Sequence, residues 1–316
     1  MAKRRFGVQT TLRNRATLSG VGVHSGQIVS MTLHPAEANS GIAFYRTNLD
    51  DGREQEIPAD HRFVSSTDLC TAVGVSGASV STIEHLMATL RALEIDNCLI
   101  EIDGPEVPVM DGSADAFIDA IDQAGIEHLS ATRRYIRVEK AVRVEMGASY
   151  AEFLPHDGRR IEVEIDFANP LIGRQRFATE ITPDIFRGEI ARARTFGFLA
   201  DVKSLWARGF ALGASLENAV VLGDDKVMNP EGLRFDDEFV RHKALDAVGD
   251  IGLARAPILG CYRSYRGGHR LNFKALDALL ADREAWSYVE MPARRDSGHA
   301  DLPAGVAAAA FGPDVS

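Results

Sequence analysis

The stretch that decides the fold runs from Arg241 to Asp250 and reads RHKALDAVGD. It places His242, Asp246 and Asp250 at successive steps of four, which on an α-helix stacks the three side chains along one face. A histidine and an aspartate one turn apart can both reach a single divalent metal ion. The alternative is a solvated charged face with a chance histidine, because acidic helix faces are common. The apolar residues that can pack inward on this helix are Leu245, Val248 and Ile251.

The size and composition of the chain indicate a folded globular protein. At 316 residues it is long for one hydrophobic core, so two domains are the default expectation. A content of 45% hydrophobic and 25% charged residues excludes wholesale disorder. The net charge of -10 gives no reason to expect binding to nucleic acid, and an anionic substrate would need a local basic patch.

Cysteine content and hydropathy indicate the cellular compartment. Cys70, Cys98 and Cys261 are odd in number and far apart, so they do not form a disulfide framework. Cys98 is expected to be a small core residue. The N-terminal MAKRRFG is not followed by the apolar run of a signal peptide, and no run of about 18 apolar residues occurs, so we expect no transmembrane helix. A reducing, cytoplasmic location is therefore expected.

The first part of the chain reads as strands followed by a helix. The glycine-rich turn GVGVHSG, residues 20–26, carries His24, for which a solvent-facing position is favoured over a functional one. Val80 to Leu93 is expected to be helical, with Glu84 and His85 in its first turn. Glu84 has two readings, a catalytic base or half of a capping box with Ser81, and the local sequence favours the capping box.

The second part repeats this order. Strands begin again after about His128, and the opening helix is followed by a strand, a Gly-Gly turn and His269. Asn272 is expected to cap a helix from Phe273 to Ala281. The similar order of the two parts favours two related α+β domains, residues 1–129 and 130–290, with a site where their helices meet. Residues 291–316, rich in Ala, Gly and Pro, are expected to form a flexible tail.

The residue types permit a metal-dependent hydrolase if the two parts converge. His85, His242 and Asp246 would offer two nitrogens and one oxygen and leave a position open, which is the form of a catalytic zinc site. Glu84 could then take a proton from water, and His269 could supply one to a leaving nitrogen. Spacing alone does not show that such distant residues meet.

The chain also resembles a known family, the zinc-dependent UDP-3-O-acyl-N-acetylglucosamine deacetylases of lipid A biosynthesis. The resemblance covers about residues 5 to 286. The motifs that carry it, in order, are GVGVHSG, STIEHLMATLRALEIDN, PEVPVMDGSADAF, ARARTFGF, GLRFDDEFVRHKALDAVGD and YRGGHRLN. Six motifs in one order are far more specific than a single His-x-x-x-Asp pattern.

The resemblance implies a role for each matched residue. It implies zinc ligands at His85, His242 and Asp246. The other implied roles are the general base at Glu84, the acid histidine at His269 with its supporting Asp250, the oxyanion-side Thr195, the sugar-side Phe196 and the substrate-binding Lys243. It also implies one zinc ion per chain and a UDP-sugar substrate that carries a fatty acyl chain.

The resemblance further implies two α+β sandwich domains with helices packed between two sheets, an active site at their interface, and a small insert in each domain. One insert would line an apolar passage for the acyl chain, and the second domain's insert is expected within about Leu171 to Ala193. Nothing in the sequence requires more than a monomer. A catalytically inactive nucleotide-sugar-binding or regulatory protein of the same fold is the alternative function, and it would lack part of the acid–base set.

Overall fold

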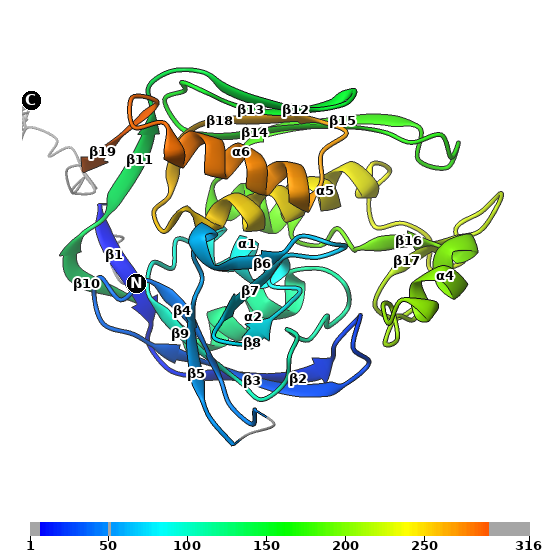
Figure 1. The fold of residues 1–316 in the computed structure, drawn as a ribbon, viewed down its shortest axis with the longest axis horizontal. Helices are drawn as coiled ribbons and strands as arrows, with labels where there is room; N and C mark the ends of the chain where they lie inside the picture. Colours follow the sequence, from blue (N-terminus) through cyan, green and yellow to red (C-terminus); the bar gives the residue numbers. More distant parts are fainter. Residues whose placement is uncertain (1–6, 50–51, 291–316) are drawn as a thin grey trace, which may run out of the picture.

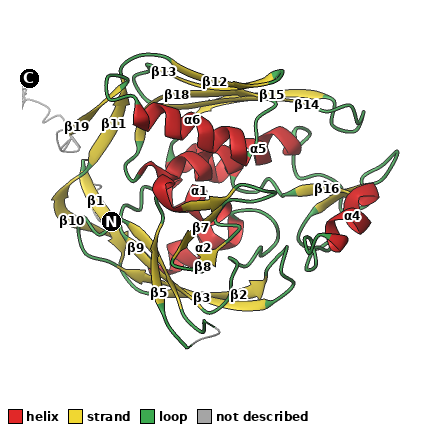
Figure 2. Ribbon diagram, in the orientation of Figure 1, coloured by secondary structure: helices red, strands yellow, loops and turns green. Residues whose placement is uncertain are grey.

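The computed structural model describes residues 7–49 and 52–290 of the 316-residue chain. Helices form the middle of the molecule and β-sheets form two outer walls (Figures 1 and 2). The expected α+β class, with helices packed between two sheets, is confirmed. The tail expected at residues 291–316 lies outside the described residues. The sandwiched helices are α1 (Glu84–Ala92), α2 (Asp115–Ala124), α5 (Glu238–Ile251) and α6 (His269–Ala281).

The wall of the N-terminal half (residues 7–124) is a five-stranded sheet with the order β2-β3-β9-β4-β5. Its side chains alternate as a half-buried strand requires: in β3, Val29, Met31 and Leu33 are buried whereas Ile28 is exposed. A smaller three-stranded sheet, β6-β7-β8, leads into α1. The strands are β2 (Ala16–Val21), β3 (Ile28–Pro35), β4 (Ile42–Arg46), β5 (Gln55–Pro58), β6 (Val64–Ser66), β7 (Ala72–Val75), β8 (Ala78–Val80) and β9 (Cys98–Ile102).

The wall of the C-terminal half (residues 134–290) is a seven-stranded sheet built around β18 (Ile258–Tyr265). This central strand pairs in parallel with β11 and β14 and antiparallel with β13. Between the halves, β10 (Ile126–Thr132) pairs antiparallel with β1 (Val8–Leu12) and contains the expected domain boundary. The other strands are β11 (Arg134–Val138), β12 (Val142–Met146), β13 (Ser149–Leu154), β14 (Arg159–Asp166), β15 (Arg174–Glu180) and β19 (Trp286–Glu290).

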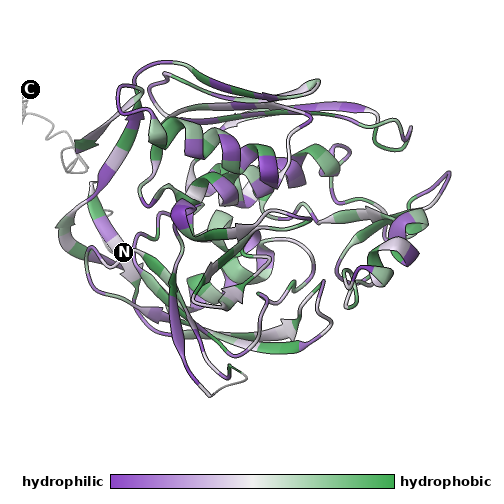
Figure 3. Ribbon diagram, in the orientation of Figure 1, coloured by the Kyte–Doolittle hydropathy of each residue, from purple (hydrophilic) through white to green (hydrophobic). Residues whose placement is uncertain are grey.

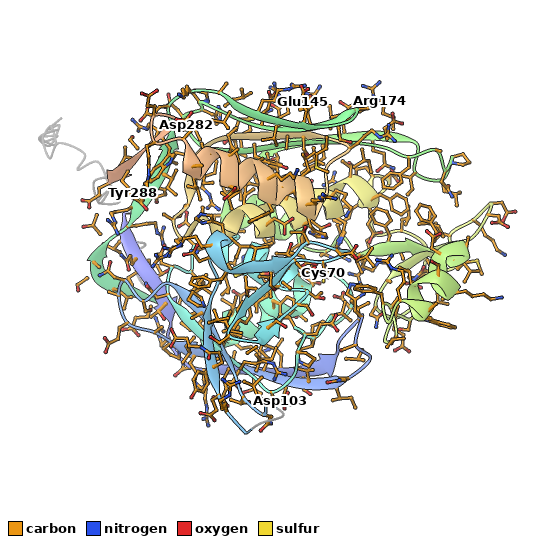
Figure 4. All side chains as sticks on the ribbon, in the orientation of Figure 1. Cys70, Asp103, Glu145, Arg174, Asp282 and Tyr288 are labelled. Carbon is orange, nitrogen blue, oxygen red and sulfur yellow. The ribbon has the colours of Figure 1, made fainter. Side chains whose placement is uncertain are left out.

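The outer face of this larger sheet carries a network of ion pairs. Figure 4 labels Glu145 and Arg174, which point away from the helices along the upper edge of the molecule. At the centre of the network, the Glu162 carboxylate accepts hydrogen bonds from Arg160 at 2.8 Å and from Arg263 at 3.0 Å. The hydrogen bond from Arg160, together with the Arg263 guanidinium, lowers the pKa of Glu162 to about 2. On the opposite face of β14, Ile161, Val163 and Ile165 are buried against the helices.

A separate unit projects from one side of the molecule (Figure 1). It consists of two parallel strands, β16 (Phe196–Phe198) and β17 (Val220–Leu222), with α4 (Val202–Ala207) between them. The expectation that the second insert lies within Leu171 to Ala193 is therefore wrong. Much of that range forms β15, whose residues 174–180 pair along their whole length with β14. Short helical turns lie at His61–Phe63, Pro183–Ile185, Phe186–Ile190, Leu199–Asp201 and Gly252–Ala254.

The two halves meet mainly through the crossing of α1 and α5. Figure 3 colours α5 and α6 in alternating purple and green bands, as expected of helices with one polar and one apolar side. At the crossing, Gly249 lies against the main chain of Glu84. A Cβ atom at position 249 would lie 2.7 Å from the carbonyl carbon of Glu84 and 2.9 Å from its Cα. Only glycine allows the two helices to approach this closely.

Two arginines, Arg91 buried and Arg159 partly buried, join the halves at the C-terminal ends of these helices. Arg91 of α1 donates from Nε to the carbonyl of Gly252, the residue that ends α5, at 2.8 Å. Arg159 of β14 donates from Nη2 to the carbonyl of Arg91, near the end of α1, at 3.0 Å. Cations at helix C-termini satisfy free carbonyls and interact favourably with the helix dipole. Each half therefore supplies the cap for a helix of the other.

Helix α6 begins earlier than expected. It starts at His269, not at Phe273, and Gly268 precedes it in an extended conformation. Asn272 does not cap a helix, because its side-chain amide donates to Asp250 at 2.8 Å. Among residues 7–49 and 52–290, no helix is both long and apolar enough to cross a bilayer.

Candidate active site

Three predicted ligand residues converge where α1 meets α5. His85 comes from α1, and His242 and Asp246 come from one face of α5. The Nε2 atoms of His242 and His85 lie 3.2 and 3.5 Å from Oδ1 of Asp246. The ligand atoms of the three residues all lie within 4.8 Å of one another, and all three side chains are buried. One turn of α5 thus supplies two donors, and α1 supplies the third.

The hydrogen bonding of this triad fits a bound metal ion. Oδ1 of Asp246 is buried and has no hydrogen-bond partner, although a buried carboxylate oxygen normally has one. The Nδ1 atom of His242 lies 3.0 Å from the carbonyl oxygen of Ala193. A carbonyl can only accept, so this contact places the proton on Nδ1 and leaves the Nε2 lone pair facing Asp246. Burial also lowers the pKa of His85, which favours the neutral form that binds metals.

Glu84 lies beside the triad and is only 3% exposed. Its Oε2 accepts a hydrogen bond from the main-chain N–H of Thr71 at 3.0 Å, and its Oε1 lies 3.9 Å from Nε2 of His269. The capping-box reading of Glu84 is wrong, because α1 begins without any side-chain cap and Ser81 bonds instead to the carbonyl of Pro105. The Glu84 side chain therefore faces the site and not the end of its own helix.

His269 faces the triad from the N-terminus of α6. Its Nε2 lies 4.0 Å from Oδ2 of Asp246, and its Nδ1 lies 3.0 Å from Oδ2 of Asp250. The Asp250 carboxylate is buried and accepts further hydrogen bonds from Asn272 and Thr71. His269 is thus held by Asp250 on one side and presents Nε2 to the site on the other.

The charges in the site are strongly coupled. Burial raises the pKa of Glu84 to about 7, although nearby His269 opposes that shift. Burial alone would lower the pKa of His269, but the carboxylates of Asp250 and Glu84 outweigh it and raise the pKa to about 9. Positive charge brought to the neighbouring triad would favour the ionised carboxylate of Glu84. A proton acceptor and a proton donor can therefore coexist in this site near neutral pH.

The remaining predicted residues form one wall of the site. The Lys243 ammonium donates to Oδ2 of Asp246 at 2.8 Å and lies 5.7 Å from the centre of the Phe196 ring. The Phe196 ring packs edge-on against Phe239, with ring centres 5.0 Å apart. The main chain of Thr195 is fixed on both sides, since its N–H donates to Gly112 at 2.8 Å and its carbonyl accepts from Val220 at 2.8 Å.

These residues open into one large cavity of about 560 Å³ between the halves and the projecting unit. Every predicted site residue except Asp250, which lies behind His269, lines it. The rest of the lining is largely apolar and includes Leu69, Val109, Met146, Leu205 and Leu271. A few convergent polar groups within an apolar cavity are typical of a small-molecule site.

His24 also lines the cavity, although the sequence favoured a solvent-facing position. It is half-buried, and its ring packs edge-on against Phe210 with centres 5.3 Å apart. The buried Glu106 carboxylate accepts from the N–H groups of His24 and Ser25 at 2.9 and 2.8 Å and so holds this turn in place. The feature of the sequence that could have indicated this position is the repeated glycine of GVGVHSG, which is typical of a turn with a special backbone conformation.

Comparison with known proteins agrees with the geometry of the site. The family model described as "LpxC: UDP-3-O-acyl N-acetylglycosamine deacetylase" matches residues 9–281. Proteins named UDP-3-O-acyl-N-acetylglucosamine deacetylase from Brucella ovis and Brucella canis are each 53% identical over 283 residues, which is 89% of this chain and 98% of theirs. The protein of that name from Brucella melitensis has the same identity and coverage. This chain therefore belongs to the UDP-3-O-acyl-N-acetylglucosamine deacetylase family.

Proposed function

We propose that Glu84 and His269 act as the acid–base pair of this enzyme, beside one zinc ion held by His85, His242 and Asp246. As a member of its family, the chain is a deacetylase, an amide hydrolase that acts on UDP-3-O-acyl-N-acetylglucosamine in lipid A biosynthesis. The proposed substrate is the 3-hydroxyacyl form. The observation that carries the assignment is Oδ1 of Asp246, buried without a partner and facing the Nε2 atoms of two histidines.

The family is metal-dependent, and zinc is the metal that these donors favour. Two imidazole nitrogens and one carboxylate oxygen, with a further position open, are the typical ligands of catalytic zinc. A bound zinc ion would polarise the amide carbonyl and make a water molecule more acidic. Sites built for magnesium or calcium use oxygen ligands instead.

The residues around the triad supply the proton transfers that amide hydrolysis needs. Glu84 takes a proton from a water molecule as the water oxygen bonds to the acetyl carbon. His269 donates a proton to the sugar nitrogen as the C–N bond breaks, which releases acetate and a free amine. Asp250 holds the Nδ1 side of His269 and so keeps Nε2 directed at the reacting nitrogen. Glu84 and His269 face each other across 3.9 Å, with space for the reacting group in front of them.

The cationic and apolar walls of the cavity fit the two ends of this substrate. The Lys243 ammonium and the Thr195 hydroxyl are placed to stabilise negative charge on the acetyl oxygen or to bind anionic groups of the substrate. Phe196 presents an aromatic edge to the sugar. We further propose domains at residues 1–129 and 130–290, and a monomer that works in the cytoplasm. An inactive binding protein of the same fold would lack part of the acid–base set, whereas here the whole set lines one cavity.

Removal of the metal tests this proposal directly. Treatment with a chelator is expected to abolish acetate release from the acylated UDP-sugar, and zinc is expected to restore it at one ion per chain. Elemental analysis and acetate release are measured on the same samples, and chelator saturated with zinc beforehand serves as the control. If pure, metal-replete protein releases no acetate from this substrate, the proposed function is wrong.

A second test separates the acid from the ligands. His269→Ala is expected to keep its metal and to lose at least about 10²-fold in kcat, the lower end of the range for a lost acid or base. The physical reason is that Nε2 of His269 lies 4.0 Å from the ligand Asp246, and Nδ1 is occupied by Asp250. Metal content and kcat are measured together. The control is His34→Ala, because His34 lies in β3 and pairs with Glu101 at 3.1 Å near the surface. A large loss of metal from the His269→Ala protein would indicate that His269 is a metal ligand and would contradict its assignment as the acid.

A further inference from the structure

Thr71 lies between the two carboxylates on which the proposed proton transfers depend. Its main-chain N–H donates to Oε2 of Glu84 at 3.0 Å. Its hydroxyl donates to Oδ1 of Asp250 at 2.6 Å. The residue is only 1% exposed, and it comes directly before strand β7, next to Cys70, which Figure 4 places between the two sheets. A single residue thus contacts both the proposed base and the partner of the proposed acid.

The hydrogen bonds of Asp250 show why a hydroxyl is needed at this point. Oδ2 of Asp250 accepts from His269 at 3.0 Å and from Asn272 at 2.8 Å. Oδ1 has Thr71 as its partner and is shielded from solvent, since Asp250 is only 2% exposed. Without the hydroxyl, Oδ1 would be buried and unpaired, and the carboxylate would be free to turn toward other donors. The orientation of His269 depends on that carboxylate.

The main chain around Thr71 is itself fixed to the start of α1. The N–H of Ile83 donates to the carbonyl of Thr71 at 3.2 Å, one residue before Glu84. Thr71 therefore belongs to the N-terminal half, whereas Asp250 belongs to α5 of the C-terminal half. The hydroxyl forms a hydrogen bond across the boundary that divides the proposed base from the proposed acid.

We propose that Thr71 is a positioning residue that fixes the separation of the base Glu84 and the His269–Asp250 pair. This inference rests on the proposed function, since it assigns Thr71 a part in the same reaction. Thr71 does not line the cavity and acts only through Asp250 and Glu84. Its loss should therefore slow turnover without weakening substrate or metal binding.

Thr71→Val removes the hydroxyl and keeps the shape and the main-chain N–H. We expect kcat to fall by about 10–100-fold, the range usual when the hydrogen-bond partner of a group in a metal site is removed. KM and metal content should stay near those of the wild type. Thr71→Ser restores the hydroxyl and is expected to recover most of the rate. Thr11→Val is the matched control: Thr11 is a buried threonine whose hydroxyl accepts from Ala36 at 2.8 Å, far from the site. It should lower Tm to a similar extent and leave kcat unchanged.

A double-mutant cycle with Asp250→Asn identifies the route of the effect. If Thr71 acts through Asp250, Thr71→Val should lower kcat much less in the Asp250→Asn protein than in the wild type. A kcat for Thr71→Val equal to that of Thr11→Val would overturn the inference, and so would a full additional loss in the double variant. Failure of the proposed function would look different, because the wild-type protein would then release no acetate.

Discussion

Glu84→Ala protein is expected to bind its metal as the wild type does and to lose about 10²–10⁴-fold in kcat, the loss usual for a missing general base. Glu84 is not among the three proposed ligands, so its removal should leave His85, His242 and Asp246 in place. Its Oε1 lies 3.9 Å from Nε2 of His269. The other carboxylates near His269 have other proposed tasks, since Asp246 is a proposed ligand and Asp250 holds Nδ1. We therefore expect the upper part of this range.

Glu84→Gln refines the test, because the amide oxygen can still accept from Thr71 but cannot take up a proton. Both variants should show similar losses of kcat, with metal content, acetate release and Tm measured on the same preparations. If Glu84 served only to stabilise the start of α1, its loss would cost about 0.5–2 kcal/mol of folding free energy and spare turnover per folded molecule. That outcome would remove Glu84 from the mechanism.

Gly249→Ala is expected to destabilise the protein by about 3 kcal/mol or more and to disrupt the metal triad. The added Cβ would lie within 3 Å of main-chain atoms of Glu84, which cannot move away without displacing α1. Since His85 is on α1 whereas His242 and Asp246 are on α5, separating the helices separates the proposed ligands. Chemical denaturation and metal content of the purified protein would measure both effects.

Gly188→Ala is the matched control for this variant. Gly188 also lies in a helical segment, but a Cβ there would meet nothing within 4 Å. Its replacement by alanine is expected to be neutral or to stabilise by about 0.4–1 kcal/mol, because the unfolded chain loses conformational freedom. A folded Gly249→Ala protein with wild-type metal content would show that α1 can shift without loss of the site.

The sequence predicted those parts of the site that local geometry determines. His242, Asp246 and Asp250 share a helix face because their spacing follows the helical repeat, and the structure shows that face on α5. The apolar alternation in β3 and β14 likewise follows from the two-residue period of a strand. That His85 joins His242 is a tertiary fact, which the resemblance to a family implied and spacing could not.

Two of the errors share a physical cause, which is competition between local and long-range hydrogen bonds. Ser81-x-x-Glu84 has the pattern of a capping box, but the Glu84 carboxylate bonds to Thr71. Asn272 has the composition of a helix cap, but its amide bonds to Asp250. Thr71 itself has no sequence pattern, because an isolated threonine before a strand is ordinary. In each case a partner distant in the chain decided the geometry.

The exchanged arginine caps link the ends of the two central helices to docking of the halves. Arg91 bonds to the carbonyl at the end of α5, and Arg159 bonds to a carbonyl near the end of α1, so both hydrogen bonds form only when the halves dock. Docking is also the event that brings His85 to His242 and Asp246. We therefore expect metal loading to follow docking of the halves, because an undocked or truncated chain has the three proposed ligands apart. If the proposed ligand set is the one used, supply of the ion is expected to be a late maturation step and not an aid to early folding.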